Sequence, residues 1–317
     1  ALGRWIAGDI DGALRQWEAV LAESPRDVLA LRLAHANYFW AGRGDEMRAS
    51  LERVAPRWSE SMPGYPGFLA CLAFALEESG EYAAAERYGR RAVELDPTEV
   101  WGAHAVAHVL EMQRRSGEGI AWLAGLEPHW GGKGAFLHHL WWHRAMFHLA
   151  RREHDAVLDL YDRRFRNLSS ALVAALPDFH VDVQNAASML ARLELRGVAV
   201  GARWEELADK AEARIGDVLS AWTVPHWMMA LAAAGRDAGA RAMLENLQIN
   251  SSRVMREVAA PVSEALLAHR RGQYARVVAL MAPVLGRLRE LGGSHAQRDV
   301  LVQIFSDSNR RAQRVAA

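Results

Sequence analysis

A turn signal that recurs along the whole chain limits the fold more than any other feature of the sequence. Each turn follows an apolar stretch, and the intervals are 34 to 38 residues, apart from one of 45 residues. The turn positions are Gly8, Gly42, Gly80, Arg114, Arg152, Gly197, Gly235 and Gly272. A nearly constant period of this length is typical of helical repeats, in which each helix pair buries its apolar stripe only against its neighbours.

One period shows the packing positions of such a repeat. In the segment GEYAAAERYGRRAVELDP (80–97), the small residues Ala85, Gly89 and Ala92 recur at helical spacing, and Pro97 closes the segment. Small residues at these positions allow two helices to cross closely, as in the second half of a tetratricopeptide repeat. The sequence therefore predicts an all-α fold, a superhelical solenoid of about seven antiparallel helix pairs.

Composition and the chain's beginning add further expectations. The 38 basic and 38 acidic residues cancel, which argues against a nucleic-acid surface, and no apolar run reaches the ~18 residues of a membrane helix. The single cysteine, Cys71, lies in the apolar run FLACLAFAL and is expected to be buried and inert. We expect one helical-repeat domain over residues 1–317. Because ALGRWIAGD resembles the end of a helix, we expect that an N-terminal segment of this domain is lacking. We also expect a cytoplasmic location.

Histidines concentrate in the middle of the chain. Eight of the 13 lie between His104 and His154. His104, His108 and Glu111 are spaced i, i+4, i+7 and share one face of a helix, and His139 and His143 repeat the i, i+4 spacing on the first helix of the next pair. In this class of repeat the first helices line the concave surface, so these side chains are candidates for a site.

Three interpretations of the histidines compete. Two imidazoles one helical turn apart can chelate a divalent metal, with Glu111 as a third ligand, but the spacing matches no metalloprotease signature. Buried histidines can also be ordinary core residues, although each ring nitrogen then needs a partner. The third interpretation is a binding pocket walled by Trp142, with histidine and glutamate orienting a ligand. We favour the pocket and no cofactor, with a metal at His104, His108 and Glu111 as the alternative.

Later polar segments are expected to complete the pocket. The segment PDFHVDVQN (177–185) contains Asp182, whose competing interpretation is a helix cap. His226 begins a helix in WTVPHWMMAL, and in GGSHAQRD (292–299) Ser294 is the expected cap of a helix. We expect this last segment to approach the central histidines. The additional ligand-binding candidates are Asp182, His226, His295, Arg298 and Asp299.

Several segments together resemble the tetratricopeptide repeat protein 38 family. They are LALRLAHANYFWAGR (29–43), WGAHAVAHVLEMQ (101–113), HLWWHRAMFHL (139–149), VQNAASMLARLELRGVAVGARW (183–204) and GGSHAQRDV (292–300). The resemblance spans essentially the whole chain and implies an all-helical repeat fold, usually with a longer N-terminus. It implies no particular activity. The chain departs from the family pattern at Arg114 and Arg152, where the turn residue is usually glycine.

The favoured function is a binding module that holds a small molecule or short peptide end at His104, His108, Glu111, His139, Trp142 and His143. The first alternative is an enzyme, a hydrolase or lyase, in which His104, His108, His139 and His143 are the catalytic acids and bases. The second is a scaffold that docks partner proteins in an open groove. Nucleic acid and membrane are not expected partners, and the oligomeric state is left open.

Overall fold

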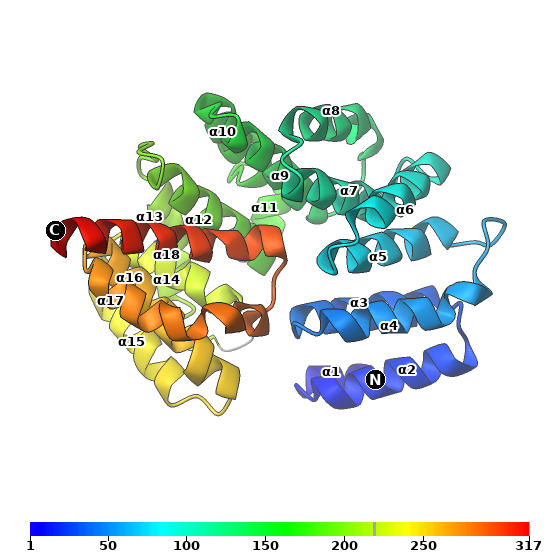
Figure 1. The fold of residues 1–317 in the computed structure, drawn as a ribbon, viewed down its shortest axis with the longest axis horizontal. Helices are drawn as coiled ribbons and strands as arrows, with labels where there is room; N and C mark the ends of the chain where they lie inside the picture. The colour runs from blue at the N-terminus through cyan, green and yellow to red at the C-terminus, as the bar shows by residue number, and fades with distance from the viewer. Residues whose placement is uncertain (218–219, 317) are drawn as a thin grey trace. The chain divides into compact units, whose positions relative to one another are not determined.

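The computed structural model describes residues 1–217 and 220–316, and within these ranges every regular element is a helix (Figure 1). The all-α prediction is therefore confirmed. By its internal contacts the chain divides into two compact units, Ala1–Lys133 (unit 1) and Gly134–Ala317 (unit 2). The expectation of a single domain stays a prediction.

Unit 1 consists of helices of one to four turns. They are α1 (Leu2–Ile6), α2 (Ile10–Glu23), α3 (Val28–Trp40), α4 (Gly44–Val54), α5 (Tyr65–Glu78), α6 (Tyr82–Leu95), α7 (Val100–Met112) and α8 (Ser116–Leu126). Short 3₁₀ segments, Ala55–Arg57 and Glu127–His129, extend α4 and α8.

Unit 2 continues in the same manner. Its helices are α9 (Phe136–Ala150), α10 (His154–Leu160), α11 (Ala171–Ala175), α12 (His180–Glu194), α13 (Arg203–Glu212), α14 (Thr223–Ala233), α15 (Asp237–Gln248), α16 (Ala260–Arg270), α17 (Tyr274–Met281) and α18 (His295–Ala316). Two π-helical segments, Tyr161–Phe165 and Met255–Ala259, and a 3₁₀ segment, Ala282–Leu291, adjoin α10, α16 and α17.

All eight expected turn residues adopt left-handed backbone conformations. Six are the glycines, and the other two are Arg114 (φ 58°) and Arg152 (φ 61°). In each turn the N–H of the left-handed residue donates to the carbonyl three residues earlier, as Gly80 does to Glu77. The N–H of the next residue donates to the carbonyl five residues earlier, as Glu81 does to Leu76. This is the Schellman pattern of helix termination. The turns join eight packed helix pairs within the described residues, one more than the expected number of about seven.

The small residues of the repeat lie where helices cross. Ala85 and Ala92 of α6 are fully buried, and α6 packs against α7. A Cβ atom on Gly89 would lie 2.7 Å from the Val106 side chain, and one on Gly102 would lie 2.9 Å from Ala92 Cβ. The absence of a side chain at Gly89 and Gly102 therefore lets α7 approach α6 closely, which fixes where the histidines of α7 lie.

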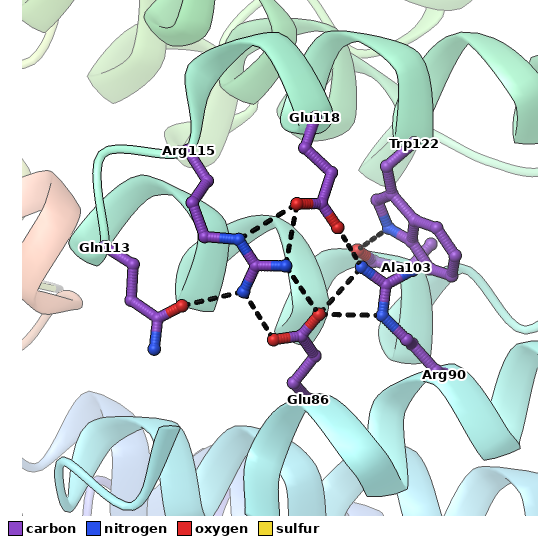
Figure 2. A network of polar contacts seen from close by, with 7 residues as sticks. All are labelled: Glu86, Arg90, Ala103, Gln113, Arg115, Glu118 and Trp122. Carbon is purple, nitrogen blue, oxygen red and sulfur yellow. Dashed lines mark hydrogen bonds and ion pairs between the residues drawn. The ribbon is translucent and has the colours of Figure 1, made fainter. Parts of the chain in front are cut away.

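A polar network ties α8 to the two preceding helices (Figure 2). The Arg115 guanidinium donates to both oxygens of Glu86 on α6, at 2.6 and 3.0 Å, and to Glu118 on α8 at 2.7 Å. Arg90 binds Glu86 and Glu118 from the other side and lies over the Trp122 ring. The Trp122 indole N–H donates to the Ala103 carbonyl of α7. The network links three consecutive helices of unit 1.

Each unit has its own hydrophobic core. One cluster of buried apolar residues runs from Leu14 to Val109 and the other from Trp142 to Ile304. Cys71 belongs to the first cluster, which confirms that it is buried, and burial raises the pKa of its thiol to about 11, which disfavours the reactive thiolate. Across the two described ranges, none of the helices combines the length and the apolar character that crossing a bilayer demands.

The two arginines in left-handed turns give a first prediction. We expect Arg114→Gly to raise the free energy of unfolding by about 0.5–1 kcal/mol. The left-handed conformation costs a residue with a side chain roughly 1–2 kcal/mol, and glycine removes this cost. The greater conformational freedom of glycine in the unfolded chain offsets only part of the stabilisation. The measurement is chemical denaturation. Gln113→Gly is the control, because Gln113 has a φ of −86° and gains nothing from glycine. An Arg114→Gly variant no more stable than the parent would contradict the strain argument.

Candidate functional site

Unit 2 holds two histidine contacts between neighbouring helices. α9 packs against α12, and there His138 Nδ1 lies 2.6 Å from Asp182 Oδ2 while His139 Nδ1 lies 3.1 Å from Asn185 Oδ1. All four side chains are buried. Asp182 and Asn185 are three residues apart and therefore share the face of α12 that meets α9.

Asp182 was open to a capping interpretation, and the structure gives it another role. Phe179 is the N-cap of α12, and no side chain there caps the helix. Asp182 lies in the first turn, where a carboxylate is stabilised by the helix dipole, but its oxygen accepts from His138. Burial raises the pKa of Asp182, against the opposing effect of the His138 contact. The side chain is therefore a buried acid in contact with a histidine.

His139 and His143 form the i, i+4 pair that the spacing predicts. Their Nε2 atoms are 3.3 Å apart, and both rings are buried. Burial lowers the pKa of His139 to about 4, so the ring is neutral at pH 7. Because its Nδ1 faces the Asn185 oxygen, that nitrogen carries the proton, and its Nε2 is an acceptor toward His143.

Trp142 and Arg192 connect this pair to the C-terminal helix. The Trp142 ring stacks on His139 with centroids 5.3 Å apart, and the buried Arg192 guanidinium lies 5.7 Å from the centre of Trp142. Arg192 also donates to the Ala296 carbonyl at 2.7 Å. The segment 292–299 thus reaches α12 and, through Arg192, the tryptophan of α9.

The start of α18 is held by a capping box. Ser294 Oγ accepts from the Gln297 N–H at 3.2 Å, and Gln297 Oε1 accepts from the Ser294 N–H at 2.9 Å. The expected Ser294 cap is therefore confirmed. Gly293 has a φ of 76°, and a Cβ there would lie 2.7 Å from the Trp222 indole. The glycine lets the loop lie directly on Trp222.

His226 lies on α14 and contacts Trp222, the residue on which the Gly293 loop packs. Its Nδ1 donates to the Trp222 carbonyl at 2.8 Å, and the ring is buried. Burial lowers the pKa of His226 to about 4, and the positive charge of Arg192 also lowers it, while the Trp222 carbonyl opposes the shift. His226 is therefore a neutral, anchored ring at pH 7.

The remaining candidates from the last segment lie nearer the surface. The His295 side chain is exposed. Arg298 is half-buried and donates to the Gly293 carbonyl, and Asp299 is half-buried and accepts from Gln303. These contacts order the first turns of α18.

Three buried polar atoms in the first two turns of α12 have no hydrogen-bond partner within the described part of the chain. They are Asp182 Oδ1, Gln184 Oε1 and Asn185 Nδ2. The other amide atom of Gln184 donates to Thr223 Oγ1 at 2.8 Å. An unsatisfied buried polar group costs about 1–3 kcal/mol, so three on one helix mark a place where a partner is needed.

Unit 1 holds a buried histidine pair on α7. His104 and His108 face each other with Nε2 atoms 2.8 Å apart, and His108 Nδ1 is 3.5 Å from Glu77 Oε2 of α5. His108 and Glu77 are completely buried, and Phe74 stacks on His104. The carboxylates grouped with His108 are Glu77 and Glu78, whose ligand atoms lie within 4.8 Å of one another and of His108. Glu111, the expected third ligand, is half-buried and is not in that group.

Sequence reasoning did not single out several of the contributing residues. Asn185 and Arg192 are polar residues in the otherwise small and apolar stretch NAASMLAR, and Glu77 ends the apolar run FLACLAFALE. A buried charge in such surroundings needs a partner, and that signal was present in the sequence. Which partner it meets depends on the register between helices.

A groove on unit 2 lies elsewhere. Its volume is about 290 Å³, and its rim carries Glu194, His269, Arg270 and Arg311. These groups already bind one another or a neighbour, as in Arg270 with Glu194 at 2.9 Å and Arg311 with Asp307 at 2.7 Å. We therefore place the candidate site at α9 and α12, where polar atoms lack partners. No protein-family model matches the chain, so the site must be interpreted from its own chemistry.

The neutral buried histidines give a second prediction. In the unfolded chain His226 is protonated below about pH 6.5, whereas in the folded chain it stays neutral down to about pH 4. The free energy of unfolding therefore falls as the pH falls through this window. A shift of this size corresponds to up to about 3 kcal/mol. We expect His226→Asn, which retains a donor for the Trp222 carbonyl, to lessen the fall measured by denaturation at pH 7 and pH 4.5. Exposed His129→Asn is the control, and equal pH profiles for the parent and His226→Asn would refute the assignment.

Proposed function

We propose that the protein is a helical-repeat binding protein whose unit 2 holds a small polar ligand between α9 and α12. The observation that carries this proposal is the set of unpartnered polar atoms on α12. Asn185 Nδ2 is a donor and Asp182 Oδ1 an acceptor, and they lie on one helix face beside His139 and Trp142. A ligand with one acceptor and one donor, such as an amide, a carboxylic acid or a short peptide end, would satisfy both.

Several features support binding over acid–base catalysis. A general base works best when its pKa lies near the working pH, and a pKa of about 4 makes His139 and His226 weak bases at pH 7. Asp182 has a raised pKa and contacts His138, and this acid–histidine pair supports the alternative of a hydrolase or lyase. A docking scaffold is supported only by analogy with other repeat proteins.

The repeat class itself is part of the proposal. We infer that the helix pairs are tetratricopeptide-like and stack as a solenoid, which the shared Schellman turns and the contacts between successive first helices support. The resemblance to the tetratricopeptide repeat protein 38 family supports the same inference. A cytoplasmic location completes the proposal, in keeping with a single free cysteine.

The ligand proposal predicts a specific loss on Asn185→Asp. This change keeps the side chain's shape and the acceptor for His139 but replaces the Nδ2 donor by an oxygen. We expect isothermal titration of the parent with small amides, carboxylic acids and dipeptides to identify a ligand, and Asn185→Asp to bind it at least tenfold more weakly, equivalent to about 1.4 kcal/mol.

The matched control is Asn246→Asp on α15, because the Asn246 amide binds the Ile215 carbonyl away from the site. This variant should bind the ligand as the parent does. If no compound of the panel binds, or if Asn185→Asp binds equally well, the proposal fails. A high-resolution crystal structure in which only ordered water satisfies Asn185 Nδ2 and Asp182 Oδ1 would assign these atoms a structural role instead.

A further inference from the structure

The buried cluster of unit 1 has the arrangement of a metal chelate. α5 and α7 pack against each other, and α7 places His104 and His108 on the face toward α5. Their Nε2 atoms point at each other across 2.8 Å. Two imidazoles fixed on adjacent turns of one rigid helix can offer both Nε2 lone pairs to a single ion.

The surroundings of the pair hold the rings in place. Phe74 stacks on His104 with centroids 5.2 Å apart and meets His108 edge-on at 5.3 Å. The close approach of α6 and α7 at Gly89 and Gly102 fixes the position of α7 against α6. The rings are therefore positioned by packing before any ion binds, which lowers the cost of assembling a site.

The Glu77 carboxylate distinguishes this arrangement from a simple contact between two histidines. Its carboxylate is completely buried and lies 3.5 Å from His108 Nδ1, the nitrogen that faces away from His104. A histidine that binds a metal through one nitrogen usually donates its other N–H to a carboxylate or carbonyl, which fixes the tautomer and strengthens the ligand. A shift of roughly 0.5 Å from the 3.5 Å separation would let Glu77 do this for His108.

We propose that His104 and His108 bind a divalent transition-metal ion of the zinc class through Nε2, with Glu77 as the outer carboxylate on His108 Nδ1. Imidazole ligands suit zinc, cobalt, nickel and copper, and hard cations such as magnesium prefer oxygen. Tetrahedral zinc with bonds of ~2.0–2.1 Å separates two ligand nitrogens by about 3.3 Å, so the rings need to part by roughly 0.5 Å. Rotation about the side-chain torsions covers that distance.

Zinc and cobalt are the probes for this site. Tag-free protein is stripped with a chelator, dialysed against submicromolar free Zn²⁺, and its metal content is measured by mass spectrometry. We expect bound zinc in the parent and the loss of at least one ion per chain in His104→Gln/His108→Gln. The control is exposed His129→Gln on the 3₁₀ segment, which should retain the zinc of the parent. Equal zinc content in the double variant and the parent would overturn the proposal.

Variants of the two glutamates test the arrangement without removing a ligand. Glu77→Gln should weaken zinc binding about 10- to 100-fold, as for other outer partners of a metal-bound histidine. Glu78→Gln should leave it unchanged. If Glu78→Gln abolishes binding while His104→Gln does not, the ion is held by Glu77, Glu78 and His108, and the proposed chelate is wrong.

Two measurements on the parent keep the test valid if the double variant folds poorly. Zinc added to stripped protein should raise the midpoint of thermal unfolding. Cobalt should give the visible absorption of a four-coordinate site, and added zinc should remove it. A parent protein that shows neither effect at submicromolar metal has no such site.

Discussion

The fold depends on a left-handed residue at the end of each first helix. That residue reverses the chain and directs the next helix back along the one before it, so each pair forms from local hydrogen bonds. Reversals at similar intervals bring successive first helices into contact, as α5 with α7 and α12 with α14. A side chain on one first helix therefore meets side chains from the neighbouring one, and the polar clusters of both units are built in this way.

Much of this architecture could be predicted from the sequence. The repeat spacing located the turns within the eight described helix pairs, including those at Arg114 and Arg152, and the i, i+4 spacing of histidines placed each pair on one helix face. Periodicity within a helix says which residues share a face, but not how far that helix is shifted along its neighbour. For this reason Asn185 and Glu77 were not expected as partners of His139 and His108, since only the register of α9 on α12 and of α5 on α7 brings them together.

Asp182 shows why residue type and position can mislead. A carboxylate in the first turn of a helix usually caps it or interacts with its dipole, and the sequence alone cannot show that a histidine lies 2.6 Å away. Arg192 is a similar case, because the sequence does not show that its guanidinium meets the Ala296 carbonyl, 104 residues further along the chain. Distant parts of the chain provide the His138 contact of Asp182 and the Ala296 carbonyl that accepts from Arg192, and these contacts offset part of the cost of burying the two charged groups.

The contact between Arg192 and the start of α18 has a consequence for how the protein is made. The core of unit 1 is drawn from residues that the ribosome delivers early, and its contacts join neighbouring helices, so it can form while synthesis continues. In unit 2 the buried guanidinium of α12 acquires the Ala296 carbonyl only after the last helix has begun to emerge. A chain in which α18 has not yet formed therefore lacks this contact, and we expect the packing around Arg192 to be completed late in folding.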